Sequence, residues 1–402
     1  MSLPVPASRF PTWLVLLGIL MTVAPLSIDM YLPGFPAVAR EFGVAPGAVQ
    51  LTLATFFVGL AIGQLFYGPI SDRFGRKKPL YVGYTLYGLA SLGCALAPGV
   101  TALAGWRFVQ AIGGCAGMVI SRAIVRDRCD PVAAAKAFSV LMLVMGVAPI
   151  LAPLLGGWVV ALAGWRVIFG LLVLFASLCL IAIHFTLEES LDKAQPHPLE
   201  LRRVLRGYAE LLRDRHFMSY TFSSGLAMGG MFAYIAGSPF VLIQIYGIPA
   251  TDYGWVFGSN ALGLISASQL NTRLLRRYKL NRILQQALWA PLLAGLGLLL
   301  AALAGHPPLY VILPGFFVYI TSLGFAAPNG SALALQHQGR RAGMASALMG
   351  SLQFSLATVM GLVMGVWHSN SVLPLATLMA GCGVSAFAVH RLVAMRVEGN
   401  GL

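Results

Sequence analysis

Twelve long apolar runs dominate this chain of 402 residues. Each run approaches the ~20 residues that an α-helix needs to cross a bilayer. The runs are continuous and not alternating, which favours helices over the strands of a membrane β-barrel. We therefore expect an all-α membrane protein with twelve transmembrane helices. The expected spans are 12–33, 48–70, 79–98, 102–125, 134–160, 165–187, 217–245, 252–273, 281–304, 309–330, 341–366 and 371–393.

The basic residues are distributed unevenly between the loops. The net charge of +14 could by itself suggest binding to nucleic acid. With the N-terminus placed in the cytoplasm, however, 23 of the 27 Lys and Arg residues fall on the inner side and two on the outer side. This bias obeys the positive-inside rule, so the charge is mainly a topology signal. We expect both termini in the cytoplasm and no nucleic-acid partner.

A hydrophilic stretch at 188–216 divides the spans six and six. We expect an N-terminal bundle over 1–187, a cytoplasmic linker over 188–216 and a C-terminal bundle over 217–402. Two pseudo-symmetric halves of six helices resemble the major facilitator superfamily, whose substrate site lies between the halves near the midplane. Within the linker, 199–217 has the pattern of an amphipathic helix, either on the anionic inner leaflet or as a solvated connection.

Asp29 is the only acidic residue that lies well inside a predicted span. An ionised Asp at the bilayer centre costs about 2.5–3.5 kcal/mol, and a low dielectric favours the protonated carboxyl. Such a group could load and release a proton as its surroundings alternate between wet and dry. Arg107, in the fourth span, has a similar expected depth from the rise per residue. The two side chains could pair statically, or exchange partners with a proton or substrate.

The loop after the second span reads G-P-I-S-D-R-F-G-R-K-K over 68–78. It resembles the loop 2–3 signature of major facilitators, in which such contacts close the inner gate. Asp72 could reach Asp127 through a basic residue of the loop, or could face the start of the eleventh span near 340–343. Charge that only sets topology is the other interpretation. The candidate gate residues are Gly68, Asp72, Arg73, Gly75, Arg76 and Asp127. The counterpart at 271–279 keeps the bases but lacks the Asp and the second Gly.

The fifth span carries G-V-A-P-I-L-A-P-L-L-G-G. Prolines inside a helix remove backbone donors and bend it, and glycines let a neighbouring helix approach closely. The run resembles the antiporter motif of exporting superfamily members and favours export over uptake; a kinked packing helix is the alternative. The motif residues are Gly146, Pro149, Pro153, Gly156 and Gly157.

The residues around Asp29 narrow the resemblance. The run P-L-S-I-D-M-Y-L-P at 25–33, the segments 63–73 and 125–127, and Arg107-Phe-Val-Gln resemble the bicyclomycin/chloramphenicol-resistance (Bcr/CflA) group of drug:proton antiporters. The resemblance implies proton-driven efflux of small amphiphilic drugs across the bacterial inner membrane. It implies Asp29 and Arg107 as the polar site, protons as the coupling ion and no other cofactor. The first helix lacks the second acid of some relatives, which argues against doubly cationic drugs.

Several polar, aromatic or flexible residues lie in spans that usually line the cavity, and each could equally be a packing residue. A proton-coupled importer or a metabolite exporter on the same scaffold is the alternative function. An enzyme or channel is disfavoured, because the sequence holds no phosphate loop and no HExxH motif. We expect a monomer. The candidate pocket residues are Tyr31, Gln110, Met118, Phe232, Tyr234 and Asn329.

Overall fold

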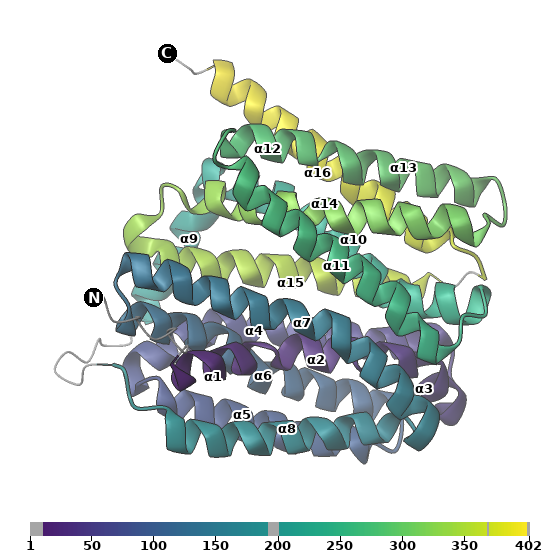
Figure 1. Cartoon of the computed structure of the whole chain (residues 1–402), viewed down its shortest axis with the longest axis horizontal. Coiled ribbons are helices and arrows are strands. Elements are labelled where there is room, and N and C mark those ends of the chain that lie inside the picture. The colour runs from purple at the N-terminus through teal and green to yellow at the C-terminus, as the bar shows by residue number, and fades with distance from the viewer. Residues whose placement is uncertain (1–10, 192–200, 368–369, 400–402) are drawn as a thin grey trace, which may run out of the picture.

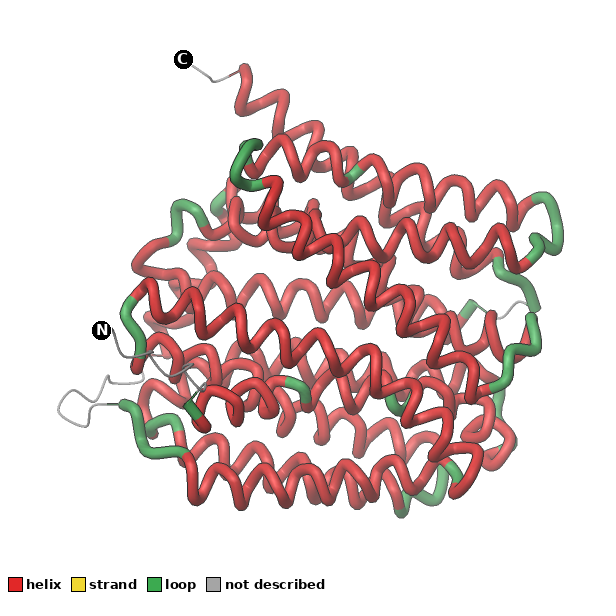
Figure 2. The backbone as a smooth tube through the Cα atoms, viewed as in Figure 1, coloured by secondary structure: helices red, strands yellow, loops and turns green. Residues whose placement is uncertain are grey.

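The computed structural model describes residues 11–191, 201–367 and 370–399. Within these ranges the backbone consists of helices and connecting turns, without a β-strand (Figure 2). Ten helical segments of the described chain are long and apolar enough to cross a membrane. Two further helices, α5 (Lys77–Ala95) and α11 (Ala250–Leu274), are more polar but pack beside them. Each of the twelve predicted spans therefore corresponds to a helix or to consecutive helices.

The first half begins with a broken helix. The predicted first span ends at residue 33, but the helical path continues through a 3-10 turn at Leu32–Gly34 and ends at Gly43, whose φ is 62°. Proline is tolerated here because it occupies the first turn of a helix, where its missing N–H is not needed. The remaining helices of this half are α1 (Thr12–Met21), α2 (Val23–Asp29), α3 (Phe35–Phe42), α4 (Pro46–Phe74), α6 (Val100–Arg128), α7 (Pro131–Ala163) and α8 (Trp165–Thr186).

The second half repeats this layout after a short linker helix. In Figure 1 its green and yellow helices lie together above the purple and blue helices of the first half. The linker helix is α9 (Leu201–Arg213). Besides α11, the elements of the second half are α10 (Arg215–Pro239), the π-helical turn η2 (Phe240–Ile245), α12 (Leu280–Ala287), α13 (Trp289–Leu303), α14 (Leu309–Leu335), η3 (Gly339–Arg341), α15 (Ala342–Val366) and α16 (Leu373–Gly399).

The two halves meet along two helix pairs. Helix α4 packs against α15, and α7 packs against α11, in the middle of the molecule (Figure 1). We call the end of the molecule that holds the turn at 75–76, α9 and the turn at 275–279 the inner end, and the opposite end the outer end. This places any site between the halves beside α2, α4, α7, α10, α11 and α15.

The linker helix α9 is docked and does not float in solvent. Tyr208 donates its hydroxyl to the backbone oxygen of Leu65 in α4 at 3.2 Å. Glu210 pairs with Arg341, at the start of α15, at 2.7 Å, and Leu211 is 1% exposed. Neither expected interpretation, a helix on the inner leaflet or a solvated connection, included these contacts with the two halves. Helix α9 bridges the two halves at the inner end.

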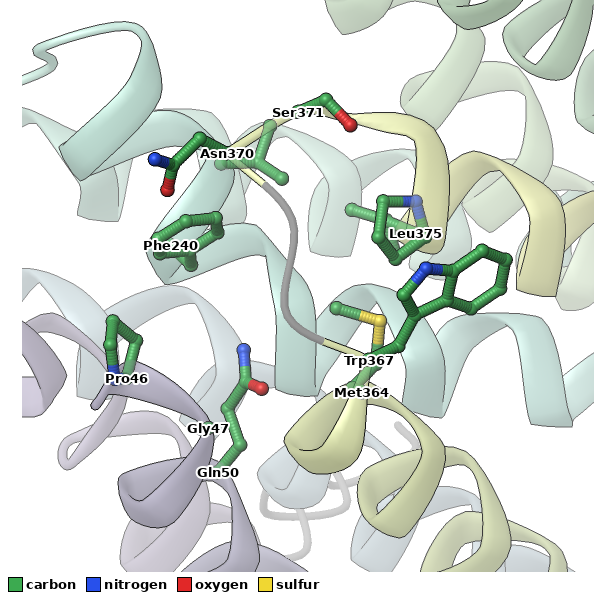
Figure 3. A pocket seen from close by; sticks show the side chains of 11 residues that line it. Pro46, Gly47, Gln50, Phe240, Met364, Trp367, Asn370, Ser371 and Leu375 are labelled. Carbon is green, nitrogen blue, oxygen red and sulfur yellow. The ribbon is translucent and has the colours of Figure 1, made fainter.

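Cavities between the halves differ in size at the two ends. The inner cavity measures about 870 Å³ and is lined by α4, α6, α9 and α15, including Asp72, Tyr208 and Gly343. The outer cavity measures about 70 Å³; Figure 3 shows Gln50 of α4 facing Phe240 and Met364 of the other half. Of these two cavities, the one at the inner end is the larger.

Candidate functional site

Asp29 is the last residue of α2 and is 4% exposed. The chain turns directly after it, and the next turn, η1, contacts α10 and α11 of the second half. The backbone oxygen of Met30 lies so close to Gly156 of α7 that a Cβ at that glycine would collide with it. The carboxyl is thus held at the junction of both halves.

Within the described chain Asp29 forms no ion pair and no hydrogen bond. The turn that follows it contacts α10 and α11, the helices that carry Tyr234 and Tyr253. Both tyrosines belong to the second half, whereas Asp29 belongs to the first. An acid beside a contact between the halves is sensitive to any relative movement of the halves.

The hydroxyls of these two tyrosines are held by a small polar network. The Asn260 side-chain amide donates to the Tyr234 hydroxyl at 2.8 Å, and the Ser238 and Tyr253 hydroxyls lie 2.9 Å apart. Sequence analysis missed Tyr253, Asn260 and Ser238. Asn260 offered a signal, because it is an amide in the middle of an apolar span.

Arg107 lies in an aromatic cage within the first half and is fully buried. Its guanidinium carbon is 4.1 Å from the centre of the Phe56 ring, 4.9 Å from that of Tyr31 and 5.8 Å from that of Phe169. Ring faces attract a cation electrostatically, by about 2 kcal/mol or more when both are desolvated. The cage therefore offsets part of the cost of burying this charge.

The hydrogen bonds of Arg107 lead away from Asp29. Its Nη1 donates to Gln110 Oε1 at 2.7 Å, and Gln110 donates to the Ser91 hydroxyl at 2.7 Å. Its Nε and Nη2 lack a partner in the described part of the chain. The static ion pair between Asp29 and Arg107 is therefore not formed in this conformation. Two donors remain available, as partner exchange would require.

At the inner end, Arg76 joins the acids of the predicted gate. Its Nη1 bonds Asp72 at 2.5 Å and the Ser71 hydroxyl at 2.8 Å, and its Nε bonds Asp127 at 2.8 Å. Arg76 is 5% exposed, and the bonds to both aspartates raise its pKa although burial alone would lower it. Of the two loop bases that could bridge the acids, Arg73 and Arg76, it is Arg76 that joins Asp72 to Asp127.

Glu189, which sequence analysis missed, completes this cluster. It follows α8 and accepts the backbone N–H groups of Arg76 at 2.7 Å and Lys77 at 3.1 Å. Burial alone would raise the pKa of Glu189, but these bonds and those from Leu191 and Ser190 lower it. No side-chain motif in the sequence singles it out from the other acids of the inner end. We call Asp72, Arg76, Asp127 and Glu189 the inner cluster.

Gly75 is required between these charges. Its φ of 88° is a region that side chains rarely adopt, and an added Cβ would lie 2.5 Å from a Glu189 oxygen. Other predicted gate residues lie at the edge. Gly68 accepts the Ser71 hydroxyl, and exposed Arg73 lies 5.2 Å from the Phe74 ring centre.

The alternative partner of Asp72, the start of α15, lies across the same space. Gly343 and Asp72 both line the inner cavity, and a Cβ on Gly343 would lie 2.9 Å from Arg126 Nη1. The first half therefore touches α15 here through Arg126. Asp72 contacts Arg76 and faces the cavity with a side chain that is 55% exposed.

The motif of the fifth span lies on the face of α7 that meets other helices. Gly157 is so close to Ala250 of α11 that a Cβ would overlap the Ala250 oxygen, and Gly146 would place one 3.2 Å from Ile265. Pro149 and Pro153 lie inside the continuous helix. Together with Gly156, the motif glycines face both the end of α2 and the second half.

The six predicted pocket residues fall into different surroundings. Tyr31 and Gln110 belong to the Arg107 cage, and Tyr234 to the polar network with Asn260. Phe232 packs on Phe57 of the other half at 5.2 Å between ring centres. Two other predicted residues, Met118 and Asn329, are buried, and Asn329 bonds Asn271 at 2.7 Å within the second half.

Solved structures share this arrangement of helices. The xylose transporter XylE from Escherichia coli superposes with a TM-score of 0.74 at 14% identity, over 94% of this chain and 96% of that one. The nucleoside transporter NupG superposes with a TM-score of 0.73 at 13% identity, over 95% and 98%. At these identities the likeness shows the fold alone.

Curated relatives cover the whole length. The chain is 37% identical to the uncharacterized MFS-type transporter YdgK of Bacillus subtilis, over 96% of both chains. It is 32% identical to a bicyclomycin resistance protein homolog of Haemophilus influenzae, over 97% of this chain and 98% of that one. It is 28% identical to the multidrug resistance protein MdtL of Escherichia coli strain K12, over 93% and 94%.

The sequence model described as Major Facilitator Superfamily matches residues 17–362. This match, the relatives and the two packed halves agree with one another. The chain belongs to the major facilitator superfamily and is a multi-pass membrane transporter.

Proposed function

We propose that this transporter is a proton-driven antiporter that exports small amphiphilic drugs of the bicyclomycin or amphenicol kind. The observation that carries the proposal is the buried Asp29 carboxyl, which has no ion-pair partner in the described chain and lies next to the turn that contacts α10 and α11 of the opposite half. A carboxyl without a fixed counter-charge can change its protonation state at modest cost, which a permanent ion pair would prevent.

The cycle follows from this placement. With the halves open outward, Asp29 takes up a proton and drug leaves; with the halves open inward, the proton is lost as drug enters. The hydroxyls of Tyr234 and Tyr253 stabilise the carboxylate when the halves close on it, because they can donate to it. Arg107 keeps two free donors for a polar group of the drug or for the carboxylate.

Two further features support export. The α7 glycines let the fifth span pack on the end of α2 and on α11, so movement of the halves is felt at Asp29. Relatives over the whole length include proteins named for resistance to bicyclomycin and to multiple drugs. The inner cluster locks the inner end of the first half. We further propose a monomer in the bacterial inner membrane, with both termini cytoplasmic, coupled to protons alone and without enzymatic activity.

The test uses the full-length protein in liposomes with an imposed proton gradient. Wild type should accumulate chloramphenicol or bicyclomycin against its concentration when the drug-receiving side is acidic. Asp29→Asn should lose gradient-driven accumulation while still exchanging drug down its own gradient. Asp252→Asn, an exposed acid at the start of α11, should transport like wild type.

Each alternative has its own signature. Uphill pumping by Asp29→Asn would remove the proposed coupling site. Accumulation on the side opposite to the acidic one, in the direction of proton flow, would identify an importer. If neither drug were transported but a metabolite were transported in response to the proton gradient, Asp29 would remain the proposed coupling site and the substrate would be a metabolite instead of a drug.

A further inference from the structure

The second half carries an open groove at the inner end, away from the site described above. It lies between α12 and α14, with the end of α11 at its mouth, and measures about 600 Å³. We propose that this groove binds one anionic phospholipid of the inner leaflet, with the phosphate at the 275–279 turn and an acyl chain along α12 and α14.

The segment 273–282, which contributes Arg282 to the lining of the groove, has an excess of positive charge. Five bases occur within ten residues, and each is exposed or half-buried. Among the described residues none of the five forms an ion pair, and the sequence has no Asp or Glu between Asp252 and Glu398. A phosphate therefore meets cations that lack nearby acidic partners on these helices. The five bases are Arg273, Arg276, Arg277, Lys279 and Arg282.

The lining of the groove combines a charged end with mainly apolar walls. Tyr278, Arg282 and Gln286 line the mouth, and the last two share one face of α12 because they are four residues apart. The Arg282 guanidinium carbon lies 5.8 Å from the centre of the Tyr278 ring. The rest of the lining is mainly apolar, with two hydroxyl residues, Thr321 and Ser322. A charged end beside a mainly apolar lining matches a phosphate followed by a hydrocarbon chain.

The apolar part of the groove is partly exposed, as a site that is filled by a lipid chain would be. Phe317 and Val318 of α14 are 41% and 47% exposed, and Ala287 of α12 and Ala290 of α13 also line the groove. From Arg282 to Ala290 the helical path rises about 12 Å, at 1.5 Å per residue, which is roughly one leaflet's hydrocarbon depth. The small alanines leave space that a chain can fill.

Topology alone accounts for positive charge on an inner loop, but not for the groove. The positive-inside rule needs bases near the end of a span, with no requirement for a cavity beside them. Here Arg282 and Gln286 line a groove whose remaining walls are mainly apolar. The combination distinguishes a specific lipid site from a generally basic surface.

The test measures phosphatidylglycerol binding by the full-length protein. Nanodiscs of phosphatidylcholine with increasing phosphatidylglycerol are prepared, and bound lipid is counted by native mass spectrometry after release. Lys279→Gln/Arg282→Gln should weaken phosphatidylglycerol binding roughly thirtyfold, since each base near the surface contributes about fivefold. Ala287→Phe keeps every charge but fills the groove, and should also reduce binding.

The control is Lys78→Gln/Lys136→Gln, which removes two exposed inner bases of the first half. This variant should bind phosphatidylglycerol like wild type. If the control and groove variants lost phosphatidylglycerol binding equally, surface charge alone would explain the binding and the proposal would be overturned. So would normal binding in Ala287→Phe, or full competition by inorganic phosphate, because both would show a phosphate site without a lipid chain. Unfolding temperatures in pure phosphatidylcholine confirm that all variants are folded.

Discussion

The turn after α4 and the turn after α11 occupy equivalent places in the two halves, yet their charges are handled in opposite ways. Arg76 and Lys279 each precede the first turn of the third helix of their half. Arg76 is buried among acids, whereas Lys279 is exposed and has no ion pair in the described chain. The charge of the first turn is neutralised by acids of the protein, whereas the charge of the second turn is in contact with solvent or lipid. Equivalent positions in a repeated fold thus need not keep equivalent roles.

The largest expected difference between the turns comes from removing each base. Arg76→Gln leaves Asp127, with a side chain that is 20% exposed, without its counter-charge, and should destabilise the protein by about 3 kcal/mol. Lys279→Gln in phosphatidylcholine should change stability by less than about 0.5 kcal/mol. Denaturant unfolding midpoints in detergent and in nanodiscs measure both. Similar shifts in the two variants would show that the turns are handled alike.

A smaller effect is expected from the backbone of the first turn. Gly75→Ala forces a side chain into positive φ and against Glu189, at a cost of about 1–3 kcal/mol. The same unfolding assay reads this cost. Gly99→Ala is the control, because Gly99 has extended φ and open space around its Cα. A Gly75→Ala protein as stable as wild type would mean that the turn can relax and that the inner cluster is not rigid.

The smallest effect is a pH dependence confined to the first turn. The folded pKa of Glu189 is lowered, so its stabilising contribution is present at neutral pH and is lost as the pH falls below the ordinary value of about 4.3. Glu189→Gln should therefore flatten the acid limb of the stability curve. Its exposed neighbour gives the control, Glu188→Gln, which should keep the wild-type limb. An unchanged limb in Glu189→Gln would assign the acid sensitivity to other carboxylates.

Sequence patterns predict how far along a helix a residue lies, but not the direction in which its side chain points. Counting residues placed Asp29 and Arg107 at similar depths, because helix rise is constant. It could not say which way each side chain points around its helix. Asp29 lies beside a contact with the second half and Arg107 faces aromatic rings of the first, so equal depth did not produce a pair. Rotation of a helix about its axis depends on packing with all its neighbours.

Long-range partners were the other limit. The bridge from Asp72 to Asp127 was expected because both belong to motifs near span ends, and Arg76 makes it. Glu189 was missed because its partners are backbone N–H groups more than one hundred residues earlier, which no side-chain pattern encodes. The docking of α9 was missed for the same reason, since Tyr208 bonds a backbone oxygen of α4.

The linker has a mechanical consequence. The chain passes from one half to the other once, through 188–214, and α9 in that segment is fastened to α4 and to the start of α15. A force that pulls the halves apart at the inner end therefore loads a covalent tether, whereas the same force at the outer end meets only side-chain contacts. Opening at the inner end is therefore opposed by the linker as well as by side-chain contacts, whereas opening at the outer end is opposed by side-chain contacts alone.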